Sequence, residues 1–173
     1  MDATFTPIGT VRTPYSLAED TPVQAALNQG QEAVVELDPA YVDGLDGLAG
    51  FSHVWLVTWL HRPHDGGVAA TTPAPLQLVP FLLRGTGRRL GVFATRAPRR
   101  PNAIGLSLVR VTSVEGPRVH VLGIDLLDGT PVLDLKPYFP DADRPDDPVR
   151  GGWFDELELR QGIRPSDVGP PTP

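Results

Sequence analysis

The sequence contains no cysteine among its 173 residues. This absence excludes disulfide bonds, thiolate zinc sites and a thiol nucleophile, so any chemistry must come from other side chains. Lysine is nearly absent too, since Lys136 is the only one beside fourteen arginines. No hydrophobic run reaches the length of a membrane span, and the first residues lack the pattern of a signal peptide. We therefore expect a cytoplasmic protein with no membrane partner.

Glycine and proline divide the chain into short segments. The 18 glycines and 20 prolines leave few windows in which a helical period could continue for three turns. Apolar runs between turn residues predict strands at 8–12, 33–37, 51–60, 76–83, 90–94, 104–114, 118–124 and 131–135. Such a succession of short strands favours a mainly β fold, a single antiparallel β-barrel without exposed edges.

Helix is expected only in short pieces. These lie at residues 22–27, 43–48 and 153–159, the last of which could equally be a strand. We assign the barrel domain to residues 1–140, followed by an acidic, proline-rich extension at 141–173 that completes or flanks it.

Charge is unevenly distributed along the chain. The net charge of −6 argues against a non-specific grip on nucleic acid through the overall field. Six arginines nevertheless fall between residues 84 and 100, whereas residues 141–158 contain seven acids. One face is therefore expected to be locally basic, with an acidic segment that masks or balances it.

The most informative stretch is residues 96–107. It contains three arginines, two prolines and one asparagine: Arg96, Arg99, Arg100, Pro98, Pro101 and Asn102. Each proline fixes its own φ and restricts the residue before it, so the arginines are presented with little conformational freedom. An arginine fork matches a carboxylate or phosphate in bidentate fashion. The stretch predicts an anion-binding loop, and the alternative is a solvated basic hairpin loop.

Aspartates punctuate residues 123–138. Asp125 and Asp134 stand inside apolar runs, where a carboxylate needs an arginine, a backbone donor or a bound cation as its partner. Asp128 precedes Gly129, a pair typical of tight turns, so a structural role is the alternative for this residue.

The four histidines do not indicate a metal site. His61 and His64 have a possible ligand spacing, but no further ligand matches them. His61 and Arg62 stand where an apolar strand ends, a position from which a polar pair can face a ligand. Motifs of the common serine hydrolases, P-loop enzymes and Rossmann folds are missing. The residues alone indicate a β-rich domain for a ligand that carries both an anionic and a cationic group.

Four blocks of sequence resemble the TrmO, or TsaA-like, family. They are residues 8–15, residues 50–56 with 61–62, residues 96–107 and residues 125–138. The resemblance implies a single β-barrel unlike the Rossmann methyltransferases, paired as a homodimer with the cofactor near the subunit interface. It implies S-adenosylmethionine as cofactor, and tRNA as the substrate, methylated on N6 of threonylcarbamoyladenosine at position 37.

The resemblance also implies the residues of the site. Those expected along the cofactor are Gln24, His61, Arg62, Arg96, Asn102, Leu106, Ser107, Asp125, Leu126, Leu127, Asp128, Gly129 and Thr130. An arginine would pair with the methionyl carboxylate, aspartates with the ammonium and sulfonium groups, and leucines would flank the adenine. Asp128, Asp134 and His61 are possible bases for the N6 proton. The residues expected to contact RNA are Arg84, Arg88, Arg89, Arg99, Arg100, Lys136 and Tyr138.

Three functions stay open at this point. The first is methylation of tRNA, the second is N-methylation of a small molecule or peptide by a shortened family member, and the third is a non-catalytic module that binds S-adenosylmethionine. Longer bacterial members continue into a C-terminal domain that we expect this chain to lack. Binding of tRNA separates the first function from the others, and turnover of the cofactor separates the second from the third.

Overall fold

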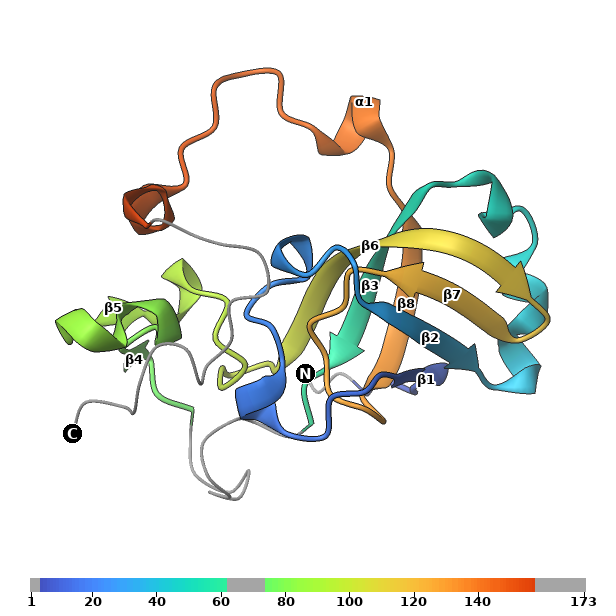
Figure 1. Cartoon of the computed structure of the whole chain (residues 1–173), viewed down its shortest axis with the longest axis horizontal. Coiled ribbons are helices and arrows are strands. Elements are labelled where there is room, and N and C mark those ends of the chain that lie inside the picture. The colour runs from blue at the N-terminus through green and yellow to red at the C-terminus, as the bar shows by residue number, and fades with distance from the viewer. Residues whose placement is uncertain (1–3, 62–73, 158–173) are drawn as a thin grey trace.

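The computed structural model describes residues 4–61 and 74–157 (Figure 1). Six strands close a barrel in the order β1–β2–β7–β6–β3–β8, and every neighbouring pair that the register gives is antiparallel. Their bounds are Gly9–Arg12 (β1), Glu32–Leu37 (β2), His53–Trp59 (β3), Ile104–Glu115 (β6), Arg118–Leu122 (β7) and Pro131–Pro137 (β8). The predicted antiparallel barrel is confirmed.

The alternation of side chains explains the barrel. In β6, Gly105, Ser107 and Val109 are buried, whereas Ile104 and Leu106, which alternate with them, are exposed. Such a period of two places one row of side chains in the core and the next row outside. The fully buried core side chains are mainly valines with one leucine and one isoleucine: Val11, Val35, Val54, Leu56, Val109, Val119, Ile124 and Val132.

Residues 74–103 lie outside the closed barrel, and here two predicted strands are wrong over most of their length. The segments 76–83 and 90–94 contribute only the two-residue strands Gln77–Leu78 (β4) and Leu90–Gly91 (β5), which pair with each other. Pro80 leads into a 3-10 helix, η5 (Phe81–Thr86), and Gly87 ends it with a φ of +65°. A proline at the start and a left-handed glycine at the end are helix signals that interrupt an apolar run.

The remaining helices are short. They are Ala18–Asp20 (η1), Ala25–Leu27 (η2), Pro39–Leu45 (η3), Leu48–Gly50 (η4), Val92–Ala94 (η6), Pro140–Asp143 (α1) and Gly152–Glu156 (η7). Helix was expected near three of them, η2, η3 and η7. Residues 144–151 are exposed and lead from α1, next to the barrel, to η7 (Figure 1). Across residues 4–61 and 74–157, no helix has both the length and the apolar character to span a bilayer.

Candidate functional site

A carboxylate joins three parts of the chain where β7 ends. Asp125 follows β7, and its Oδ1 accepts a 2.6 Å hydrogen bond from Oγ of Ser107, which is buried on the inner face of β6. The backbone N–H of Ala25 in η2 also bonds to this carboxylate. Burial raises the pKa of Asp125, while the bonds from Ser107 and Ala25 and the charge of Arg96 oppose that rise. The carboxylate is therefore costly to ionise unless a cation is close.

The arginine whose charge acts on this carboxylate is held by a side-chain amide. Nη1 of Arg96 donates a 2.6 Å hydrogen bond to Oε1 of Gln24, the residue directly before η2. Gln24, Arg96, Ser107 and Asp125, here called the Asp125 cluster, thus come together from four distant parts of the sequence. All four were expected along the cofactor.

One residue of this neighbourhood escaped the sequence analysis. Asn28 ends η2, and its Nδ2 donates a 2.7 Å hydrogen bond to the carbonyl oxygen of Ile124. This bond fixes η2 against the residue before Asp125. An asparagine just after a short helix is a common cap, so the sequence carried a local signal for a helix end but none for this distant contact.

The loop that carries Arg96 is organised by a buried threonine. Oγ1 of Thr95 donates to the carbonyl of Val92 at 2.8 Å and accepts the N–H of Ala97 at 3.3 Å. Nη1 of Arg100 donates to the carbonyl of Thr95 at 3.2 Å. Arg100 therefore stabilises the loop in addition to any contact with a substrate.

Residues 128–130 form a turn that holds β1. Oδ1 of Asp128 accepts the N–H of Thr13 at 3.2 Å, and the N–H of Gly129, whose φ is +74°, donates to the carbonyl of Val11 at 2.8 Å. Thr130 is buried, with its hydroxyl bonded to Leu127 at 2.7 Å. The side chain of Asp128 thus joins this turn to the residue after β1.

The three leucines expected to flank adenine lie in different environments. Leu126 and Leu127 are 4% and 7% exposed and belong to the barrel core, whereas Leu106 is 56% exposed. Of the three, Leu106 alone has an exposed side chain. Asn102 is also exposed and lies two residues before β6 begins.

The other two expected bases, Asp134 and His61, belong to different strands of the barrel or their ends. Asp134 in β8 is half-exposed and pairs with Nζ of Lys136 at 2.8 Å, which raises the pKa of Lys136. His61 follows β3, with its ring 6.0 Å from that of Trp59 between centroids. Arg62 and His64 fall outside the described residues. Within the ranges that are described, no three His, Asp or Glu side chains gather as a metal site.

The residues expected to contact RNA fall into two groups. Arg88 and Arg89 are exposed, and Arg84 lies over the ring of Phe81 at 4.6 Å. Arg99 and Arg100 are partly buried in the same segment. Lys136 and Tyr138 lie instead in and after β8, where the Tyr138 ring contacts His53 and Trp55 edge-on. The seven residues therefore come from two separate parts of the chain.

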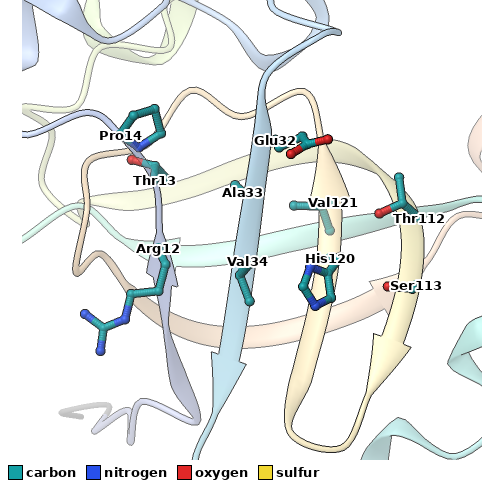
Figure 2. A pocket seen from close by; sticks show the side chains of 10 residues that line it. All are labelled: Arg12, Thr13, Pro14, Glu32, Ala33, Val34, Thr112, Ser113, His120 and Val121. Atoms are coloured by element: carbon teal, nitrogen blue, oxygen red, sulfur yellow. The ribbon is translucent and has the colours of Figure 1, made fainter.

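An open pocket of about 410 Å³ lies on another wall of the barrel, across β1, β2, β7 and β6 (Figure 2). Arg12, Val34, His120 and Ser113 form one row across these strands. Arg12 pairs with Glu36 at 3.3 Å, and His120 lies 4.0 Å from Glu115. No member of the Asp125 cluster lines this pocket.

Comparison with protein families gives a match over most of the chain. Residues 10–144 match the family described as the tRNA-methyltransferase O N-terminal domain. A probable S-adenosyl-L-methionine-binding protein of Methanothermobacter thermautotrophicus is 39% identical over 143 residues, which cover 83% of this chain and 95% of that protein. The tRNA (adenine(37)-N6)-methyltransferase of Escherichia coli K12 is 37% identical over 145 residues, 80% of this chain and 59% of that enzyme.

A solved structure matches the fold as well. The crystal structure of TrmO from Pseudomonas aeruginosa superposes with a TM-score of 0.68 at 40% identity, over 88% of this chain and 62% of the other. The chain thus spans less than two thirds of the length of these two bacterial proteins, and nearly the whole of the archaeal one.

Proposed function

Because the chain belongs to the tRNA-methyltransferase O family, we propose that it is an S-adenosylmethionine-dependent methyltransferase that acts on tRNA. The proposed acceptor is N6 of threonylcarbamoyladenosine at position 37. The observation that carries the proposal is the Asp125 cluster, in which a buried carboxylate at the end of the barrel lies within the electrostatic influence of an arginine. The name of the E. coli relative supports methylation of N6 of adenine 37 in tRNA, and the name of the archaeal relative supports S-adenosylmethionine as the cofactor.

The cluster fits the charges of the cofactor. The methionyl part of S-adenosylmethionine carries a carboxylate, an ammonium and a sulfonium group. Arg96 is suited to the carboxylate, and Asp125 in its ionised form is suited to a positive group. The exposed side chain of Leu106 offers apolar surface for the adenine ring. When bound, the cofactor supplies the methyl group that is transferred.

The chain contributes mainly the alignment of the two reactants and an electrostatic field that suits the cofactor. Methyl transfer from a sulfonium is an in-line displacement, in which holding the reactants in line supplies much of the rate. The hydrogen bond that Arg96 donates to Gln24 and the one that Ser107 donates to Asp125 fix the two charged groups before a ligand arrives. Asp128, Asp134 and His61 remain the proposed acceptors of the N6 proton. Asp128 and Asp134 already hold Thr13 and Lys136, so they would act only after giving up part of those contacts.

The proposed RNA contacts begin with the exposed arginines of residues 84–100. Arg88 and Arg89 are exposed on the segment that leads to Arg96. Arginine pairs with phosphate in bidentate fashion, and an unstacked loop base can enter a protein pocket. RNA held by these arginines would therefore lie along the same segment as the proposed cofactor site.

We also infer a homodimer and a cytoplasmic location. Trp59, Ile104 and Leu106 are 50%, 41% and 56% exposed, and they lie on neighbouring ends of β3 and β6, where Trp59 is the register partner of Ile104. A second copy that covers this apolar face would also lie close to Leu106 of the proposed site. The location follows from the proposed tRNA substrate.

The direct test is incubation of the purified protein with methyl-labelled S-adenosylmethionine and bulk tRNA that carries threonylcarbamoyladenosine. Nucleoside mass spectrometry should show the gain of one methyl group on that nucleoside. Cofactor binding without any gain would reject tRNA as the substrate. The search would then move to a small-molecule or peptide acceptor, or to a non-catalytic binding module.

A further inference from the structure

The helix η7 lies beyond the residues that match the family, yet it contacts the loop that carries Arg96. The family match ends at residue 144, and η7 spans Gly152–Glu156. Nε1 of Trp153 donates a 2.7 Å hydrogen bond to the carbonyl oxygen of Ala94. After α1 the chain passes from the barrel toward the β4–β5 segment, where η7 lies (Figure 1).

The acceptor of this bond is well placed to fix the loop. Ala94 ends η6, and the N–H of Thr95 closes that turn on the carbonyl of Val92 at 3.1 Å. Thr95 is buried, and Arg96 follows it directly. The carbonyl held by Trp153 is thus two residues from the arginine of the Asp125 cluster. The backbone between Ala94 and Arg96 is therefore too short to absorb a movement of Ala94 without shifting Arg96.

We propose that Trp153 is a positioning residue for the cofactor site. By holding Ala94, it keeps Arg96 at the place from which Arg96 bonds to Gln24 and its charge acts on Asp125. The ligand named in this inference rests on the proposed function. The contact itself does not.

Trp153 rather than the neighbouring ion pair carries this role. Arg88 and Glu156 also join η7 to this region, at 2.8 Å, but their side chains are 47% and 60% exposed. Exposed ion pairs contribute little because water and salt screen them. The Trp153 ring is half-buried, and its Nε1 donates to a backbone carbonyl, so this bond acts on the loop backbone itself, whereas the ion pair joins two side chains.

The test compares Trp153→Phe, which removes only the N–H donor and part of the ring, with Trp153→Ala. Glu156→Gln is the matched control, because it removes the ion pair with Arg88 from the same helix and leaves the hydrogen bond of Trp153 in place. The first readout is amide hydrogen exchange of residues 92–100 without any ligand. The second is calorimetric affinity for S-adenosylmethionine, with the melting temperature as a check on the barrel.

Both Trp153 variants should exchange faster over residues 92–100, with the barrel strands unchanged. Trp153→Phe should bind S-adenosylmethionine about fivefold more weakly, the effect of losing one hydrogen bond. In turnover its KM for the cofactor should rise while kcat at saturation stays constant. Glu156→Gln should behave as the wild type in each measurement.

Two results would overturn the inference. One is unchanged exchange over residues 92–100 in Trp153→Ala, and the other is an equal loss of affinity in Glu156→Gln. If the wild type binds no S-adenosylmethionine while the Trp153 variants still exchange faster, the proposed function is overturned instead. The failures of the two proposals can therefore be told apart.

Discussion

Oγ of Ser107 donates a 2.6 Å hydrogen bond to Oδ1 of Asp125, 18 residues away in the sequence. The bond joins the inner face of β6 to the segment after β7, and it gives the carboxylate a neutral donor. A neutral donor only partly offsets the cost of burial, because the pKa of Asp125 remains raised. The pair thus leaves a buried carboxylate that is best satisfied by a cationic ligand.

Asp125 should make the stability of the protein depend on pH. Burial raises its pKa above the ordinary value of 3.8, so the folded protein keeps this proton to a higher pH than the unfolded chain does. The folded state then binds more protons in the window from 3.8 up to the raised pKa. The free energy of unfolding contributed by Asp125 therefore falls as pH rises through that window. Urea unfolding across this range should show that Asp125→Asn lacks this loss.

The control for this experiment is Asp141→Asn, which changes an exposed aspartate of α1. It should keep the slope of the wild type. Parallel pH profiles for the wild type and Asp125→Asn would contradict the burial argument.

Affinity for the cofactor should depend on the same group in the opposite direction. The ionised form of Asp125 attracts the positive groups of S-adenosylmethionine, so binding should strengthen as pH rises through the pKa of Asp125. Asp125→Asn should bind more weakly at neutral pH and lose this rise. The measurement is a calorimetric titration at a series of pH values. A wild-type affinity that does not change with pH would exclude Asp125 from the site.

The double variant Arg88→Glu, Arg89→Glu should weaken tRNA binding and reduce its salt slope by about 1–2, one for each lost phosphate contact. Affinity for S-adenosylmethionine should stay unchanged, because neither residue belongs to the Asp125 cluster. Filter binding at several salt concentrations measures both slope and affinity.

Arg144→Glu with Arg150→Glu alters the net charge by the same amount at exposed positions outside residues 84–100. This control should affect tRNA binding less. Equal losses in the two double variants would mean that overall charge, and not this segment, governs the binding.

Gly9→Ala should destabilise the barrel by about 2–3 kcal/mol. A Cβ at Gly9 would meet the carbonyl oxygen of Glu36 and lie 2.8 Å from Cα of Leu37, and neither backbone atom can move without disturbing the β1–β2 pair. Gly44→Ala is the control, since a Cβ there meets no atom within 4 Å. Chemical denaturation of both variants decides the point, and equal stabilities would refute the close approach.

The barrel could be predicted because its strands alternate buried and exposed residues, as β6 does from Ile104 to Val109. Residues 76–83 misled the prediction because their apolar side chains look strand-like, while Pro80 and Gly87 in fact delimit a 3-10 helix. Local pattern cannot weigh a helix signal against an apolar run when both are short.

The charged residues of the site could also be predicted, since Arg96 and Asp125 stand out in their segments and in the family resemblance. The residues that hold these segments in place could not be predicted. Asn28 and Trp153 each bind a backbone carbonyl more than 50 residues away, at Ile124 and Ala94. Such contacts depend on the folded chain and leave no periodic or motif signal.

Calorimetric titration of S-adenosylmethionine into the wild type and Arg96→Ala tests the central claim most directly. Arg96 is exposed on a loop, so its removal should leave the melting temperature of the barrel unchanged. The account predicts binding to the wild type and a loss of about 10- to 100-fold in the variant, the effect of removing a charge-assisted hydrogen bond. Equal affinity in the two proteins would contradict the placement of the cofactor at the Asp125 cluster.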